Sequence, residues 1–94
     1  MKGIPVALAA RAFQSNLSRL TNQERRVLKH MLQARSSKET AWDLGIAVST
    51  TKNLRSRVLE KMMAENTRTL LHVAAEARRL YLAAENESGE TENA

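Results

Sequence analysis

Three polar side chains, Lys52, Asn53 and Ser56, have the types and the spacing to recognise nucleic-acid bases. Positions i, i+1 and i+4 of a helix share one side of its surface. A Lys side chain can donate to guanine O6 and N7, an Asn amide can pair with two edge groups of adenine, and a Ser hydroxyl accepts either base. These contacts require the helix to enter a major groove; otherwise the three residues form a solvated helix face.

A second set of residues could hold phosphates beside that helix. Phosphate contacts use short hydroxyl donors at helix starts and flexible cations at the rim of an interface. The expected phosphate-contacting residues are Thr21, Ser36, Ser37, Lys38, Thr50, Arg55 and Arg57. Thr21 and Ser36 can also act purely as helix caps, and the two roles are compatible.

The charge distribution favours a polyanionic partner. The chain of 94 residues has a formal net charge of +5, but four of its ten acidic residues lie in 85–94. Residues 1–84 therefore hold fifteen basic and six acidic side chains. DNA or RNA is the leading candidate for a surface of this kind, and a merely solvated basic surface is the alternative.

No group of residues in the sequence supports catalysis. His30 and His72 stand alone, without a carboxylate pair, a nucleophile or a phosphate-binding glycine loop beside them. The absence of Cys removes thiolate metal sites and fits a reducing compartment. We therefore expect no enzyme activity, no cofactor, no metal site, no membrane span and a cytoplasmic location.

The elements that would position these residues are all helical. Hydrophobic residues make up 43% of the chain, and three Gly and one Pro leave long stretches unbroken. After Pro5, apolar residues recur at three- and four-residue spacing, which indicates a first helix. The stripe that this helix is expected to bury consists of Val6, Ala10, Phe13, Leu17 and Leu20.

Two capping boxes mark the starts of the next two helices. Thr21 with Glu24, and Ser36 with Glu39, have the spacing at which a hydroxyl and a carboxylate each satisfy a backbone N–H. The first of these helices is expected to face inward with Val27, Leu28, Met31 and Leu32. The second should end at Gly45, because a tight turn needs a residue that tolerates positive φ.

A third helix is expected over about 48–62. Its expected inward residues are Thr51, Leu54, Val58 and Met62, and its outward residues are Ser49, Lys52, Asn53, Ser56 and Glu60. Two capped helices that are joined by a short turn, the second polar and basic outside, form the layout of a helix-turn-helix. The sequence therefore predicts an all-α, four- to five-helix helix-turn-helix domain with an extra N-terminal helix.

The last helix is expected to be long and to serve in dimerisation. Its apolar arc is wider than contact with one small domain requires, so we expect a second packing partner there. The expected dimerisation residues are Leu70, Val73, Ala74, Ala77, Leu80, Tyr81 and Ala84. The chain thus divides into an N-terminal helical extension (1–19), the helix-turn-helix domain (20–66), the C-terminal helix (67–84) and a disordered acidic tail (85–94).

Many positions between residues 20 and 62 match a known family pattern in register and without a gap. The matched residues are Leu20, Thr21, Glu24, Val27, Leu28, Ser36, Lys38, Glu39, Ala41, Leu44, Ile46, Thr50, Lys52, Val58, Lys61 and Met62. They resemble the LuxR/GerE-type helix-turn-helix domain of bacterial transcription regulators, and the resemblance covers nearly half the chain. It implies a stand-alone DNA-binding domain in which Lys52, Asn53 and Ser56 occupy base-reading positions.

Five positions depart from the family pattern. Ala34 stands where the family favours Gly, Thr40 where it favours Ile, and Leu54 where it favours His. Ala47 replaces the Ser or Thr that caps the recognition helix, and the Arg that follows this helix either appears one place late, at Arg68, or is replaced by Thr67. These changes leave the expected fold intact and bear on the details of phosphate contact.

Two further residues carry specific expectations. His30 falls where the family has a core Leu, so we expect it to be packed or half-buried. Trp42 lies off the inward face of its helix. We expect its indole to cover the edge of the small core, and an exposed partner surface is the alternative.

The resemblance implies a sequence-specific regulator that binds double-stranded DNA as a homodimer through its last helix. RNA polymerase and a larger LuxR-type regulator are further candidate partners. The main alternative is an antiactivator, which would pair with a larger LuxR-type regulator without binding DNA specifically. A third interpretation, a fragment similar to region 4 of a sigma factor, is disfavoured by the long final helix.

Overall fold

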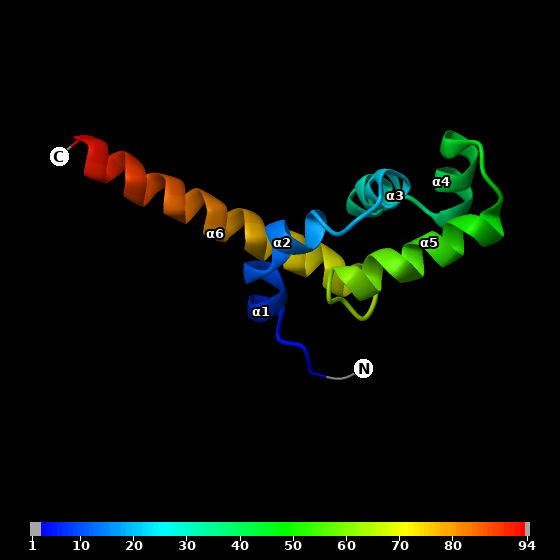
Figure 1. Cartoon of the computed structure of the whole chain (residues 1–94), viewed down its shortest axis with the longest axis horizontal. Coiled ribbons are helices and arrows are strands. Elements are labelled where there is room, and N and C mark those ends of the chain that lie inside the picture. Colours follow the sequence, from blue (N-terminus) through cyan, green and yellow to red (C-terminus); the bar gives the residue numbers. More distant parts are fainter. Residues whose placement is uncertain (1–2, 94) are drawn as a thin grey trace.

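The computed structural model describes residues 3–93 as six helices, with no strand in that range. The helices are α1 (Val6–Arg11), α2 (Phe13–Leu17), α3 (Asn22–Leu32), α4 (Ser37–Leu44), α5 (Val48–Lys61) and α6 (Thr67–Asn93). The molecule measures 54 × 29 × 21 Å because α6 extends away from the other helices (Figure 1). None of the described helices is long and apolar enough to cross a membrane. The all-helical class predicted from the sequence is confirmed.

The N-terminal segment forms two short helices instead of the single helix that the spacing predicts. The chain bends at Ala12, whose φ of −87° and ψ of 2° depart from helical geometry. α1 packs on α6, whereas Phe13 and Leu17 of α2 pack against the main core. Because of the bend, this segment contacts both α6 and the main core. It also leaves Val6, the first residue of the expected stripe, 36% exposed.

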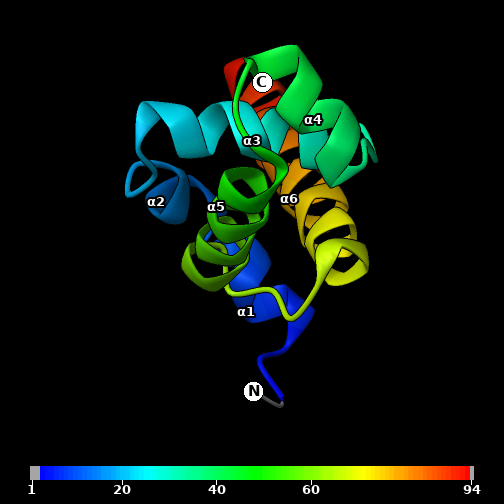
Figure 2. The same ribbon diagram turned by 90° about the vertical axis from the view of Figure 1, so that its right-hand side faces the viewer.

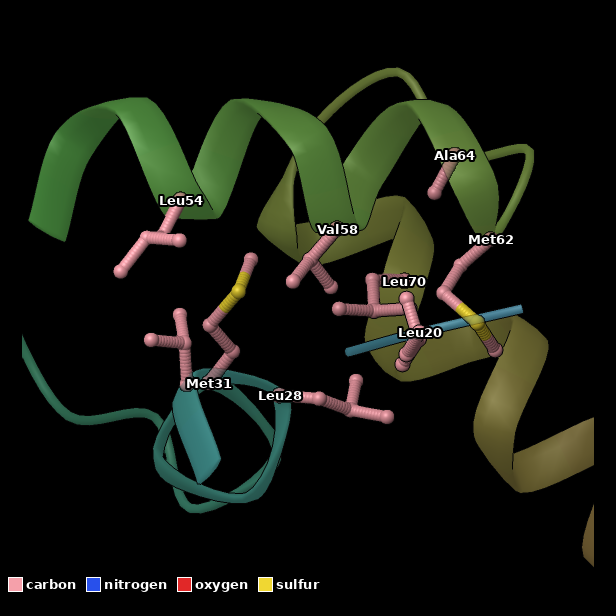
Figure 3. Close-up of a cluster of buried hydrophobic side chains, with 9 residues drawn as sticks. Leu20, Leu28, Met31, Leu54, Val58, Met62, Ala64 and Leu70 are labelled. Atoms are coloured by element: carbon pink, nitrogen blue, oxygen red, sulfur yellow. The ribbon is translucent and has the colours of Figure 1, made fainter. Parts of the chain in front are cut away.

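One core cluster fixes α5 against α3. Leu54 and Val58 project from α5 toward Leu28 and Met31 of α3, and Met62, the residue after α5, belongs to the same cluster (Figure 3). The cluster is completed by Leu20, Val27, Ala64 and Leu70. Burial of each large apolar side chain contributes about 1.5–3 kcal/mol, so this contact dominates the position of α5.

Leu32 does not join that cluster, and its expected inward position is wrong. It is the last residue of α3 and is 37% exposed. It borders an open hollow beside Leu17 of α2, on a different side of α3 from the core contact with α5. The inward face of α3 is therefore narrower than the apolar pattern predicts.

The capping boxes and the turn glycine form as predicted. Ser36 Oγ accepts from the Glu39 N–H at 3.0 Å, and Glu39 Oε1 accepts from the Ser36 N–H at 2.9 Å. The same reciprocal pair joins Thr21 and Glu24 at the start of α3. Gly45 ends α4 with a φ of 67° and a ψ of 35°, in the left-handed region that glycine adopts without strain.

A buried ion pair joins the start of α3 to the end of α5. Lys61 Nζ lies 2.8 Å from Glu24 Oε1 and donates to the carbonyl oxygen of Arg19 at 3.3 Å. Glu24 is only 2% exposed. The Lys61 ammonium, followed by the Thr21 N–H, lowers the pKa of Glu24 below its ordinary value of 4.5. The Glu24 carboxylate therefore both caps α3 and holds the end of α5.

α6 begins at Thr67 as predicted, but it is longer than expected. The prediction ended this helix near Ala84 and treated 85–94 as a disordered acidic tail, whereas α6 continues to Asn93. The added segment has no Pro, Glu favours helix, and one interior Gly costs only about 1 kcal/mol. Ala94 lies outside the described residues.

Within residues 3–93, two residues other than glycine adopt a positive φ, at the ends of α3 and α5. Ala34 has a φ of 59° and Met63 a φ of 62°. The Ala34 N–H donates to the Met31 carbonyl at 2.9 Å, and the Arg35 N–H donates to the His30 carbonyl at 3.0 Å. The left-handed region costs an L-residue about 1–2 kcal/mol, which explains why the family favours Gly at the position of Ala34.

Replacing Ala34 by Gly should stabilise the protein by about 1 kcal/mol, because the strain is relieved and only part of the gain is lost to the freer unfolded chain. Ala7→Gly, an exposed site inside α1, is the matched control and should destabilise it by up to about 1 kcal/mol. Urea denaturation measures the free energy of unfolding of both variants. Equal destabilisation by the two changes would contradict the assignment of strain to Ala34.

The ion pair predicts a specific pH dependence. A lowered pKa means that the contribution of Glu24 is complete at neutral pH and is lost as the pH falls through the folded-state pKa. Glu24→Gln should cost about 2 kcal/mol at pH 7 and progressively less toward acid pH. Glu60→Gln, on the exposed face of α5, is the control. A deficit for Glu24→Gln that stays constant across the acid range would argue against a charged pair.

Candidate DNA interface

α5 presents one polar face and buries the opposite one. Thr51 and Val58 are fully buried, and Leu54 is 6% exposed. Lys52, Asn53 and Ser56 are all exposed on the outer side of the same helix. The outward and inward faces of α5 are therefore those that the sequence predicts.

The first turn of α5 is not capped by a side chain. Ala47 is the N-cap residue, and no side chain accepts a hydrogen bond from the first turn at that position. Thr51 Oγ1 instead donates to the Ala47 carbonyl at 3.0 Å. A helix start has backbone N–H groups without helical partners, and these can bind an anion such as phosphate. Thr50, which is exposed, lies in this first turn.

The start of α4 lies beside the middle of α5. Arg55 Nη1 donates to the carbonyl oxygen of Arg35 at 3.1 Å, directly before the capping residue Ser36. Lys38 is exposed and Ser37 is half-buried. Because the Ser36 hydroxyl oxygen accepts from the Glu39 N–H, its own proton stays available to a phosphate. Three of the expected phosphate-contacting residues thus lie together in 36–38.

Thr21 lies at the other end of α5. The Glu24 carboxylate that Thr21 faces also binds Lys61, the last residue of α5. Thr50 lies in the first turn of that 14-residue helix. At 1.5 Å per residue the two ends are roughly 15 Å apart or more, so Thr21 and Thr50 cannot serve the same phosphate.

Arg55 has a structural task that the sequence analysis did not anticipate. Its guanidinium joins three elements, because Nη1 binds the Arg35 carbonyl while Nη2 donates to Thr67 Oγ1 at 3.1 Å. Arg55 is consequently half-buried, whereas Arg57 is exposed. The contact connects α5 to the start of α6, and no sequence signal could have linked residues 12 and 20 positions away from Arg55.

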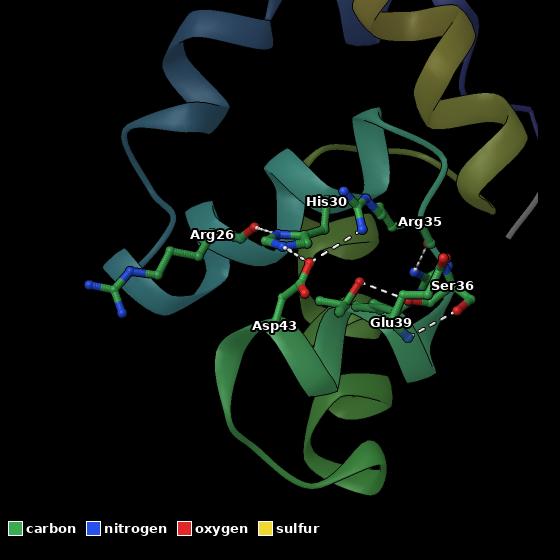
Figure 4. A network of polar contacts seen from close by, with 8 residues as sticks. Arg26, His30, Arg35, Ser36, Glu39 and Asp43 are labelled. Atoms are coloured by element: carbon green, nitrogen blue, oxygen red, sulfur yellow. Dashed lines mark hydrogen bonds and ion pairs between the residues drawn. The ribbon is translucent and has the colours of Figure 1, made fainter.

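A polar network connects α3 to α4 (Figure 4). His30 Nδ1 lies 2.8 Å from the Arg26 carbonyl oxygen, and Nε2 lies 3.3 Å from Asp43 Oδ2. Arg35 approaches the same Asp43 oxygen at 3.4 Å. The side chain of His30 is 15% exposed, which confirms the half-buried position expected from the sequence.

Trp42 does not cover the core edge, and the preferred prediction for it is wrong. The residue is 87% exposed, although the preceding Ala41 is buried. On a helix, one residue corresponds to a rotation of about 100°, which is enough to move the indole from the packed side to the open side. The α4 helix satisfies its contacts with α5 through smaller side chains, so the indole is not needed there.

Figure 1 shows α3, α4 and α5 on the side of the molecule away from the tip of α6, and Figure 2 views the molecule from that side. A glycine turn between α4 and a polar, basic α5 defines these three helices as a helix-turn-helix DNA-binding domain. The family model for bacterial regulatory proteins of the luxR family matches residues 18–74, more than half of the chain. The chain belongs to this family and is a DNA-binding helix-turn-helix regulator.

The other comparisons add no relatives. Neither the curated proteins nor the solved structures gave a significant match to this chain.

Proposed function

We propose that the protein recognises a specific DNA sequence by inserting the first half of α5 into the major groove, and that it does so as a homodimer. The observation that carries the proposal is the two-sided character of α5. Its inner face is held by the core, and its outer face offers Lys52, Asn53 and Ser56 to a ligand. A helix held in this way can present side chains to base edges with little loss of conformational freedom.

The three outward residues have distinct proposed roles. Lys52 donates to guanine O6 and N7, and Asn53 forms a bidentate contact with adenine. Ser56, one turn further along, accepts more than one base. Each good base contact discriminates by about 1–3 kcal/mol, so two such contacts account for a useful part of sequence specificity.

The phosphate contacts are proposed to flank these bases. The DNA backbone on one side of these bases is held by the start of α4, through Ser36, Ser37 and Lys38, and by Thr50 at the start of α5. Arg57 and Thr21 reach phosphates further along the site. Arg55 contributes chiefly by holding α5 against its neighbours, since both ends of its guanidinium are engaged within the chain.

The proposed dimer surface is narrower than the apolar stripe of α6. Leu70 and Val73 are fully buried inside the chain, so neither side chain is accessible to a second copy. Ala74 and Ala77 border a hollow of about 220 Å³ against α2, beside Phe13. Further along α6, Tyr81 is 59% exposed and Leu82 46% exposed, which supports a second copy packing on this part, with Ala84 beside it.

A two-fold arrangement through α6 would place two copies of α5 on one face of a duplex. Half-sites then lie about one helical turn, roughly 34 Å, apart. Two weak contacts act as one tight contact when they are joined in this way. The same exposed part of α6 supports the second candidate, an antiactivator that pairs with a larger LuxR-type regulator.

Changing Lys52 and Asn53 together to Ala should abolish the enrichment of a DNA motif. Selection from a random duplex pool should recover a palindrome with the unchanged protein and no motif with the double variant. Lys29→Ala with Gln33→Ala is the matched control, because it removes the same kinds of groups from exposed positions in the last turn of α3 and at its C-cap. A motif that survives in the double variant, or that is missing with the unchanged protein, would contradict direct readout by α5.

Tyr81→Glu with Leu82→Glu should convert a dimer to a monomer, since each change buries a charge in the proposed interface. Sedimentation equilibrium measures the mass, and binding to one half-site should remain while binding to the palindrome weakens. Leu8→Glu, at a residue that is 53% exposed on α1, is the control. An unchanged mass for the double variant would place the interface elsewhere. A monomer in all variants would favour pairing with another regulator.

A further inference from the structure

An open hollow lies on the outer side of the helix-turn-helix. It has a volume of about 720 Å³ and is lined by side chains of α4, of the turn and of the first residue of α5. Trp42, on its lining, is 87% exposed and Val48 is 41% exposed, while Ile46 is half-buried. Trp42 and Val48 therefore offer substantial apolar surface to a ligand.

The charged side chains that line the hollow differ in whether they already have a partner within the chain. Glu39 Oε1 accepts from the Ser36 N–H at 2.9 Å, as part of the helix cap. Asp43 Oδ2 faces His30 at 3.3 Å and Arg35 at 3.4 Å, on the side of α4 that meets α3. Lys38, one turn before Trp42, is exposed and forms no ion pair among the described side chains. The hollow therefore combines the Lys38 ammonium, which is free for a ligand, with two carboxylates that already have partners within the chain.

The hollow is continuous with the proposed base-reading face. Val48 lines it, and Lys52 follows Val48 by one turn of α5, so the two residues share one side of that helix. Lys38 likewise belongs both to the hollow and to the proposed phosphate contacts. When α5 enters a major groove, a surface in this position meets the backbone at the edge of that groove.

We propose that this hollow packs against the DNA backbone beside the bases that α5 reads. The indole of Trp42 covers the apolar face of a deoxyribose, and its N–H donates to a phosphate oxygen. Lys38 neutralises the same stretch of backbone, and Val48 lies nearest to a thymine methyl. This assignment rests on the proposed function and adds Trp42 and Val48 to its interface.

Exposed Trp residues are also frequent at protein interfaces. Two features favour DNA here: the lysines on either side of the apolar surface, and its continuity with the face of α5. A protein partner and a second copy of the chain are accordingly treated as outcomes of the test.

Trp42 is the only Trp in the chain, so its fluorescence reports on the hollow directly. A duplex recovered by selection, labelled with fluorescein for anisotropy, measures DNA binding independently of the indole. On saturation with the unlabelled duplex, the Trp42 emission should shift to shorter wavelength and its quenching by acrylamide should fall several-fold. Heparin, a polyanion without a groove, should leave the quenching unchanged.

Substitutions give a second, independent measurement. Trp42→Ala should raise Kd for the duplex about tenfold, by loss of the buried contact. Trp42→Lys should recover much of this loss and steepen the salt dependence of log K by about 0.9, the value for one added phosphate contact. Leu8→Ala, another exposed apolar residue, should change neither quantity.

The outcomes separate this inference from the function on which it rests. If anisotropy detects no binding to any duplex, both the proposed function and this inference fall. If the duplex binds tightly while Trp42 stays as accessible to acrylamide as before, this inference alone is overturned. If the protection of Trp42 from acrylamide grows with protein concentration in the absence of DNA, the hollow binds a second copy of the chain, and this inference is overturned. A Trp42→Lys variant weaker than Trp42→Ala would also contradict contact with a phosphate.

Discussion

The burial of one face of α5 is the constraint on which the rest of the structure depends. Val58 and Met62 are fully buried and Leu54 nearly so, against Met31 and Leu28 of α3. A helix that gives one whole face to the core has no freedom to roll, so its outer face is fixed as well. The positions of the residues that the sequence marks for base contact follow from this packing rather than from any contact of their own.

Polar contacts then hold that helix at its middle and at its end. Lys61, at the end of α5, is held by the buried Glu24 carboxylate, and Arg55, at the middle, is held by the Arg35 carbonyl and by Thr67. Arg55 thereby links α5 to the start of α6. A change of packing at the start of α6 can therefore reach α5, and this contact connects the two helices that are proposed to serve dimerisation and recognition.

Local signals were the predictable part of the fold. A capping box depends on residues three apart, and the end of α4 depends on Gly45 alone, so sequence spacing was sufficient for both. The contacts of Arg55, by contrast, join residues 12 and 20 positions away in the sequence. Nothing in the local pattern encodes such neighbours. The exposed face of α5 was predictable for the same reason as its buried face, because both depend on the periodicity of one helix.

The most direct measurement of the central claim is a set of backbone amide chemical shifts, recorded as the protein is titrated with a duplex that it selects. The account predicts that the largest shifts fall in 36–38 and 48–56, where the starts of α4 and α5 lie. Apart from its start, where Thr21 is proposed to meet a phosphate, α3 should show only small, uniform shifts. Shifts confined to α6, or spread evenly over the basic residues, would contradict recognition by α5.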